Sequence, residues 1–277
     1  MKQFSNIYIF IFSAVMVIVV AVLLSFVSQR LKPLQDKNEE VEQMRNILAS
    51  VNVEATAGNA EKLFAQYITE SFVINTSGEK IEAQKPFNVD LKKQTSKIAD
   101  INALKSKLTV RKVSPFQKLI SRPGGSEKTD MNSIHSNISK IGGTLELPVY
   151  ICDKEGKKYY VFALRGKGLW GPIWGYISLT DDFNTVYGAY FDHKTETPGL
   201  GAEIKTRGFQ MQFRNKKLYD ENNQFVSLKV LKGGASKGNV HGVDAISGGT
   251  ITSKGVERML FDWLSQYNTF IMNQKKK

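Results

Sequence analysis

Cysteine is almost absent from this chain, since Cys152 is the only one. A single cysteine excludes an intrachain disulfide and a zinc or iron–sulfur site built from clustered thiolates. The three histidines, His135, His193 and His241, stand far apart without metal-ligand spacing, so we expect no metal site. Cys152 ends the apolar run Pro148–Cys152, and we expect its thiol to be a buried core residue.

The chain also lacks a Gly-x-Gly-x-x-Gly fingerprint, so we do not expect it to bind NADH by itself. It carries 38 lysines and arginines against 26 acidic residues, a net charge of +12. Such a balance raises the question of a nucleic-acid partner. The basic residues are scattered, however, and no nucleic-acid-binding motif accompanies them. We therefore exclude nucleic acid and assign the excess to solvated surfaces, with some attraction to anionic lipid.

A long apolar run is present near the N-terminus. Ile7 to Val27 holds only apolar residues apart from Tyr8, Ser13 and Ser25. As a helix it spans about 31 Å, close to the hydrocarbon thickness of a bilayer. A cleaved signal peptide would have a shorter apolar region and a better cleavage site. We predict an uncleaved transmembrane anchor over residues 1–30.

The charges around this anchor do not settle its orientation. Four basic residues follow the apolar run within a short distance, whereas Lys2 precedes it. The positive-inside rule applied to this count places the rest of the chain in the cytoplasm. Long domains are translocated largely regardless of charge, so the count does not decide the matter.

Residues 31–140 are expected to form a helical linker and a variable region. Helical spacing of apolar residues predicts helices over Asp36–Asn52 and Asn59–Thr69, and Pro33 is expected to break the path from the anchor. Residues 71–140 are polar. Turn signals there, including Pro123–Ser126, predict surface loops or an inserted segment.

Strand patterns dominate from Thr144 onward, and the last residues form a wide apolar stripe at helical spacing. We predict a final helix over Lys254–Met272 with Ser253 as its N-cap. Packing that helix on an antiparallel sheet gives an α+β domain over residues 141–277. The predicted strands are Leu145–Cys152, Lys158–Leu164, Tyr176–Leu179, Thr185–Asp192, Phe209–Phe213 and Phe225–Val230.

The loop before this helix, Asp244–Thr250, reads Asp-Ala-Ile-Ser-Gly-Gly-Thr. Gly248 and Gly249 let backbone N–H groups approach an anion closely, because glycine has no Cβ. The helix start adds unpaired N–H groups and a positive dipole end, and Lys254 adds a full charge. The loop therefore suits a phosphate, and Thr250 offers a hydroxyl. An ordinary turn that caps a helix would use the same residue types.

Three further stretches upstream complete a pattern: Gly166–Tyr176, Val186–His193 and Glu196–Ile204. Together with the Asp244–Thr250 loop, their order and spacing resemble the NqrC family, the FMN-binding subunits of the Na⁺-translocating NADH:quinone reductases. The related FMN-binding subunit of the Rnf complex, RnfG, carries a looser version. In this family the loop is the covalent flavinylation motif, and its last threonine carries FMN through a phosphoester bond.

The resemblance implies that Thr250 is the attachment residue and that Ser247 and Gly248 shape the loop. Gly249 stands where the family usually has alanine, which is a small departure toward a more flexible loop. Lys254 would balance the remaining phosphate charge. A threonine is a weak nucleophile without an adjacent base, so we expect a separate flavin transferase to form the bond. The resemblance implies a transferase that uses FAD.

The flavin ring needs a partly apolar slot, and the Glu196–Gly201 loop is the candidate. Its glycines, Gly199 and Gly201, let backbone amides reach the ring edge, and Leu200 would cover a ring face. Thr197 offers a hydrogen bond to a ring nitrogen or carbonyl. A purely structural turn remains the alternative for this loop.

Trp170 and Trp174 flank a glycine-rich turn, and one of them is a candidate wall of the slot. Core packing is the alternative for both residues, and it is the favoured one for Trp174. His193 and Glu196 resemble an acid–base pair. We interpret both residues as structural, because a one-electron carrier needs no general base. We therefore assign no catalytic residue.

The resemblance implies a membrane-anchored redox subunit with covalent FMN, which relays electrons within a sodium-pumping NADH:quinone oxidoreductase. It places the chain in the bacterial inner membrane with its soluble domain in the periplasm, opposite to the charge count. The other membrane subunits of the complex and the flavin transferase would be its partners. An electron-transport subunit of the RnfG type is one alternative. A membrane-tethered ligand-binding domain without enzymatic function, in which the glycine loops are only turns, is another.

Overall fold

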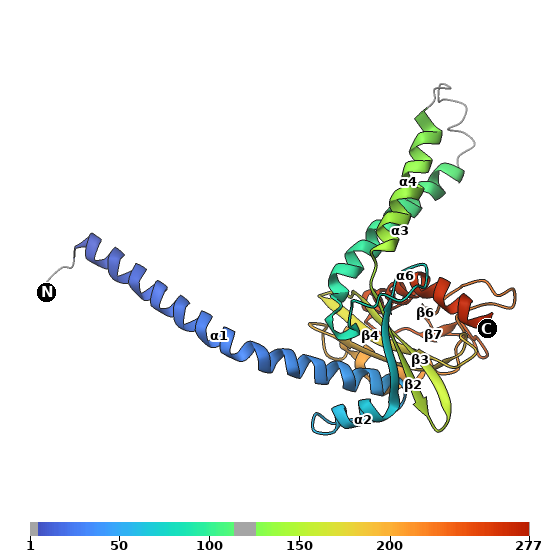
Figure 1. Cartoon of the computed structure of the whole chain (residues 1–277), viewed down its shortest axis with the longest axis horizontal. Coiled ribbons are helices and arrows are strands. Elements are labelled where there is room, and N and C mark those ends of the chain that lie inside the picture. The colour runs from blue at the N-terminus through green and yellow to red at the C-terminus, as the bar shows by residue number, and fades with distance from the viewer. Residues whose placement is uncertain (1–4, 114–125, 277) are drawn as a thin grey trace. The chain divides into compact units, whose positions relative to one another are not determined.

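The computed structural model describes residues 5–113 and 126–276 (Figure 1). The predicted turn at Pro123–Ser126 lies for the most part outside the described residues. The helices are α1 (Asn6–Ser50), α2 (Ala60–Tyr67), η1 (Pro86–Asn88), α3 (Leu91–Val113), α4 (Ser126–Gly143), η3 (Gly201–Lys205), α5 (Arg207–Met211) and α6 (Thr250–Lys275). The strands are β1 (Ile68–Ile74), β2 (Leu147–Lys154), β3 (Lys157–Lys167), β4 (Pro172–Leu179), β5 (Val186–His193), β6 (Lys229–Leu231) and β7 (Gly242–Asp244). The mixed α+β class predicted from the sequence is confirmed.

The contacts divide the chain into two units, Met1–Met44 and Arg45–Lys277. The first unit is most of α1, and within the described residues α1 is the helix that is long and apolar enough to cross a membrane. Its most apolar stretch has a mean hydropathy of 3.1, and none of that stretch is buried. These properties fit a single-pass membrane anchor.

The predicted helix break at Pro33 is wrong, because α1 continues through it. Proline inside a helix removes one N–H donor and costs about 3 kcal/mol. The residues on both sides are good helix formers, and a long helix propagates cooperatively once it is nucleated. The path from the anchor to the second unit is therefore helical.

The second unit is built on a five-stranded antiparallel sheet in the order β1-β2-β3-β4-β5. Four of its strands were predicted within a few residues of their bounds. The edge strand β1 was missed, since the predicted helix over Asn59–Thr69 ends at Tyr67 and the strand begins at once.

Both faces of this sheet are covered, because successive residues of its strands enter different cores. On one face Val149, Phe162 and Leu164 pack with buried residues of α6. On the other face Tyr150 and Cys152 pack with the last residues of α1. Coverage of both faces explains why these strands read as continuous apolar runs. The prediction that the Cys152 thiol is buried in the core is confirmed.

Helix α6 forms most of the core on its face of the sheet. Trp263, Leu264 and Tyr267 are fully buried. The Tyr267 hydroxyl donates to the carbonyl of Pro148 at 2.9 Å and lies 3.2 Å from that of Ala163. The helix axis is thereby fixed against the middle strands, and the start of α6 is held at one end of the sheet.

The prediction of surface loops over residues 71–140 is wrong for most of that segment. Helices α3 and α4 pack against each other (Figure 1), and Ile98 and Ile101 of α3 are buried. Asn102 also donates to Asp262 of α6 at 2.8 Å. The apolar residues follow helical spacing, but they are sparse among lysines and polar residues, so the polar composition misled the prediction.

Two later strand predictions also fail. Phe209–Phe213 lies in and just after α5, where Thr206 caps the helix. Phe209 and Phe213 alternate with polar residues, which suits a strand, but they are also four residues apart, which suits a helix. Their rings pack on Phe191 of β5. Of the segment Phe225–Val230, only its end belongs to a strand, the parallel pair β6 and β7.

Candidate functional site

Three loops that are distant in sequence meet at one buried carboxylate, Glu196. Its Oε1 accepts hydrogen bonds from the backbone N–H groups of Trp170 at 2.9 Å and Gly171 at 3.3 Å. Its Oε2 accepts from the Thr252 hydroxyl at 2.5 Å. The β3–β4 turn, the loop after β5 and the first turn of α6 are therefore tied together. A Cβ at Gly201 would contact both Oε2 of Glu196 and the hydroxyl of Thr252, so the loop closes tightly around this group.

The environment of Glu196 favours its charged form although its residue is only 5% exposed. Burial alone raises the pKa of the carboxyl, because a charge is costly away from water. The hydrogen bonds from Thr252 and from the N–H groups of Trp170, Gly171 and Leu169 outweigh burial and lower the pKa. Both oxygens have donors from the chain. Glu196, a predicted cofactor-binding residue, thus serves to hold the loops.

Thr250 is the first residue of α6, so the predicted helix start at Lys254 and the predicted N-cap Ser253 are wrong. The N-cap is Gly249, and the first helical bond runs from Ser253 N–H to Gly249 C=O at 2.9 Å. The Ser253 hydroxyl instead accepts from the N–H of Ile246 at 3.0 Å. The first turns of α6 contain Thr250, Thr252 and Gly255, which are weak helix formers. The sequence pattern therefore placed the start of the helix too late.

The start of α6 has backbone N–H groups without a partner among the described residues. In that part of the chain, no hydrogen bond is found for the N–H groups of Thr250, Ile251 and Thr252. Unpaired N–H groups at the positive end of a 26-residue helix are the arrangement that can bind a phosphate. The Thr250 residue is exposed, while Thr252 is 1% exposed and bonded to Glu196. Of these two threonines, only Thr250 presents its hydroxyl to solvent.

The Leu200 side chain lies against the glycines of the Asp244–Thr250 loop. Gly248 has a φ of +72°, and a Cβ there would lie 2.5 Å from Leu200 Cδ2. Gly249 has a negative φ of −101°, and a Cβ there would lie 3.0 Å from Ile246 Cγ2 and 3.2 Å from the Leu200 carbonyl carbon. The structure thus brings the two predicted cofactor loops into contact.

These two glycines predict different outcomes for the same substitution. Gly249→Ala restores the residue usual in the resembled family, and we expect it to change the free energy of unfolding by less than about 1 kcal/mol, because reduced freedom of the unfolded chain offsets the tight contact. Gly248→Ala requires a left-handed residue and displaces Leu200, so it should cost about 1–3 kcal/mol. Chemical denaturation of both variants tests this. Equal losses would show that the loop does not have the described backbone.

Exposed apolar side chains lie on the three segments that Glu196 joins. Leu169, Trp170, Leu200 and Ile251 are 44%, 67%, 42% and 59% exposed. They come from the three loops that Glu196 ties together, and we call them the apolar rim. Exposed large apolar groups gathered in one place are typical of a ligand or partner surface.

The remaining predicted residues lie as follows. Ser247, Thr197 and Gly199 are exposed, and the N–H of Gly199 donates to Glu203 at 3.0 Å. Lys254 is exposed, and its ammonium group forms an ion pair with Glu257 at 3.1 Å. Its charge is therefore partly balanced within α6.

Trp174 and His193 are half-buried. The His193 Nδ1 accepts the N–H of Glu196 at 3.2 Å. This contact is a backbone cap of the loop, in agreement with a structural interpretation of the histidine.

Comparison with known proteins gives a consistent result. Residues 168–265 match the family model described as an FMN-binding domain. The NqrC subunit of the Na(+)-translocating NADH-quinone reductase of Pasteurella multocida (strain Pm70) is 32% identical over 241 residues, which cover 85% of this chain and 81% of that protein. The corresponding subunit of Vibrio parahaemolyticus serotype O3:K6 is 29% identical and covers 89% and 86%.

Two solved structures have the same fold. The crystal structure of the same Na(+)-translocating NADH-quinone reductase subunit from Parabacteroides distasonis has a TM-score of 0.65 and 36% identity, and the match covers 87% of this chain and 96% of that chain. The crystal structure of Shewanella oneidensis NqrC has a TM-score of 0.60 and 25% identity, covering 85% and 97%. The matched FMN-binding segment contains the three loops joined at Glu196.

Proposed function

The chain belongs to the NqrC family of Na⁺-translocating NADH-quinone reductase subunits, and from this premise we propose that it carries FMN on Thr250 and relays electrons within that complex. The observation that carries the proposal is the start of α6, where the exposed Thr250 lies beside backbone N–H groups that have no partner among the described residues. A phosphoester at this hydroxyl would place its remaining phosphate charge at the positive end of the helix.

Attachment would form one bond and break one. The Thr250 Oγ1 would bond to the FMN phosphorus of FAD, the bond between the two phosphates would break, and AMP would leave. The hydroxyl proton must pass to a base. A threonine is a weak nucleophile without an adjacent base, so that base would belong to a separate flavin transferase.

The apolar rim would line the slot for the flavin ring. Trp170 and Leu200 are exposed on the two loops that Glu196 ties to α6, and they offer an aromatic ring face and an aliphatic group. The exposed Thr197 would supply a polar contact at the ring edge. Bound FMN would supply reversible electron uptake, and the residues of this chain would hold it and tune its potential.

The wider setting follows the same proposal. Helix α1 would anchor the protein in the bacterial inner membrane, and the second unit would lie in the periplasm. The chain would receive an electron from a membrane-embedded iron centre and pass it to the next flavin of the complex. The other membrane subunits and the flavin transferase are the partners that this route requires.

The test uses the full chain produced with and without the transferase. With the enzyme, the purified protein should be yellow, and the denatured protein should fluoresce as flavin in a gel. Without it, the same band should be dark. A colourless protein from cells that express the active transferase would refute the proposal and favour a domain in which the loops are only turns.

A further inference from the structure

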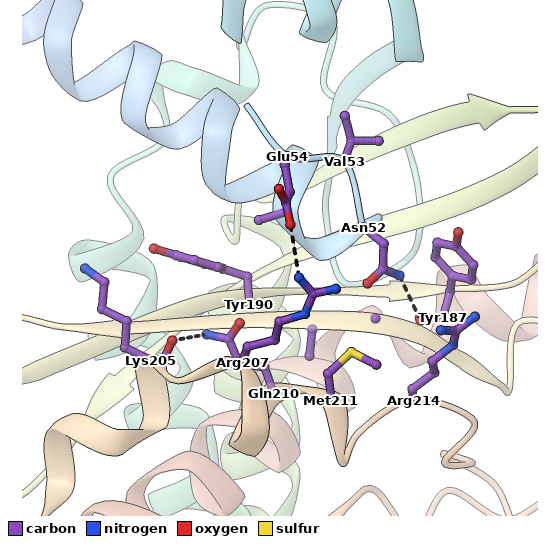
Figure 2. A pocket seen from close by; sticks show the side chains of 13 residues that line it. Asn52, Val53, Glu54, Tyr187, Tyr190, Lys205, Arg207, Gln210, Met211 and Arg214 are labelled. Atoms are coloured by element: carbon purple, nitrogen blue, oxygen red, sulfur yellow. Dashed lines mark hydrogen bonds and ion pairs between the residues drawn. The ribbon is translucent and has the colours of Figure 1, made fainter. Parts of the chain in front are cut away.

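A hollow of about 210 Å³ lies apart from the loops joined at Glu196. Its walls are the segment that follows α1, strand β5, and α5 with the turn after it (Figure 2). Charged, amide and aromatic groups line it, among them Asn52, Glu54, Tyr187, Lys205, Arg207 and Arg214. None of the predicted cofactor residues contributes to this hollow.

Two arginines face the hollow from one side of α5 and its extension. Arg207, Gln210 and Arg214 recur at a spacing of three and four residues, which places them on one helical face. Backbone bonds from Phe213 to Gln210 and from Arg214 to Met211 continue the helical turns past the end of α5. The Gln210 side-chain amide links this helical face to the sheet, because it donates a hydrogen bond to the carbonyl of Phe191 in β5 at 3.0 Å. The arginines are therefore held along β5 by a fixed backbone.

The cations around the hollow outnumber their acidic partners. The Lys205 ammonium group forms an ion pair with the buried Asp192 at 2.8 Å. Arg207 pairs with Glu54 at 3.0 Å, and both side chains are largely exposed, so this ion pair is weak. Arg214 lies by the Tyr187 ring, 5.9 Å from its centroid, and no described acidic side chain pairs with it. Figure 2 shows Arg207 reaching toward Glu54 and Arg214 beside Tyr187.

We propose that this hollow binds a phosphate group between Arg207 and Arg214. The volume is smaller than that of sites for drug-sized ligands, which favours a small anion or the head of a larger molecule. A guanidinium presents several donors in a rigid fork that matches oxyanions. The two oxygens of a carboxylate lie in one plane, whereas the oxygens of a tetrahedral phosphate point in different directions and can meet a fork from each arginine. The phosphate displaces the Glu54 carboxylate from Arg207.

The phosphate can come from a free ion or from the headgroup of an anionic lipid. Inorganic phosphate is the first probe, titrated by calorimetry into the full chain in nonionic detergent at constant ionic strength. We expect binding in the millimolar range or tighter, and Arg214→Gln should weaken it about tenfold or more, because charge-assisted hydrogen bonds are lost. Glu54→Gln should strengthen it, since a competing carboxylate is removed.

The matched control is Lys232→Gln with Lys237→Gln, which removes two exposed charges outside the hollow. Affinity should stay within about twofold of the parent. The same titration in nanodiscs with and without phosphatidylglycerol separates the two sources, because a bound headgroup would suppress phosphate binding only in the anionic discs. No binding, equal loss in the control, or an unchanged affinity in Arg214→Gln would overturn the proposal.

Discussion

Thr250→Ala should abolish the flavin fluorescence of the denatured protein in a gel, even when the flavin transferase is present. The substitution removes the oxygen that would join the phosphate, and the neighbouring Thr252 cannot replace it. Thr252 is buried, and its hydroxyl is bonded to Glu196. Thr250→Ser keeps a hydroxyl at the start of α6 and should retain a covalent signal.

Folding of the Thr250→Ala variant should be nearly unaffected. The residue is exposed, and alanine is a good helix former, so the free energy of unfolding should change by no more than about 0.5 kcal/mol. Circular dichroism and denaturant titration check this point. A folded Thr250→Ala protein that still fluoresces in the gel would show that another residue carries the flavin.

Glu196→Gln should lower the free energy of unfolding by about 1.5–3 kcal/mol at neutral pH. The carboxylate accepts from Thr252 on one oxygen and from Trp170 and Gly171 on the other. A glutamine can keep its carbonyl oxygen on the N–H groups of Trp170 and Gly171 and direct its NH₂ group to the Thr252 oxygen. The Thr252 hydroxyl proton then loses its acceptor, and the bonds from the N–H groups lose the charge that strengthens them. The apolar rim should loosen with it, which a rise in hydrogen exchange at residues 168–171 would report.

The effect should depend on pH in a defined direction. The folded state lowers the pKa of Glu196, so its charged form adds stability above the unfolded pKa, about 4.3 for glutamate. That stability is lost as the pH falls through the lower folded value. The difference in stability between the parent and Glu196→Gln should therefore be constant near neutrality and shrink in acid. A difference that is the same at about pH 7 and at about pH 3 would contradict the role given to the carboxylate.

The sequence predicted those features whose cause is local. The apolar run of the anchor, the middle strands and the glycine loop before α6 each carry their signal within a few consecutive residues. The strand prediction for Phe209–Phe213 was wrong because the spacing of its apolar residues fits both a strand and a helix. Helices α3 and α4 were not predicted because few of their residues are apolar.

The role of Glu196 was out of reach for a different reason. Its partners lie between 25 and 56 residues away along the chain, and only the fold brings them within hydrogen-bond distance. The same holds for the contact between Leu200 and Gly248. A single sequence names the loops of such a site but not the contact that joins them.

The position of α6 after the strands in the sequence has a consequence for the order of events during synthesis. This helix supplies the fully buried Trp263, Leu264 and Tyr267, so the core over β3 stays open until α6 has left the ribosome. The helix start at Thr250 and the hydrogen bond from Thr252 to Glu196 form when that segment docks. The proposed flavin loading would therefore act on the folded domain, and a protein truncated within α6 should be neither stable nor loaded.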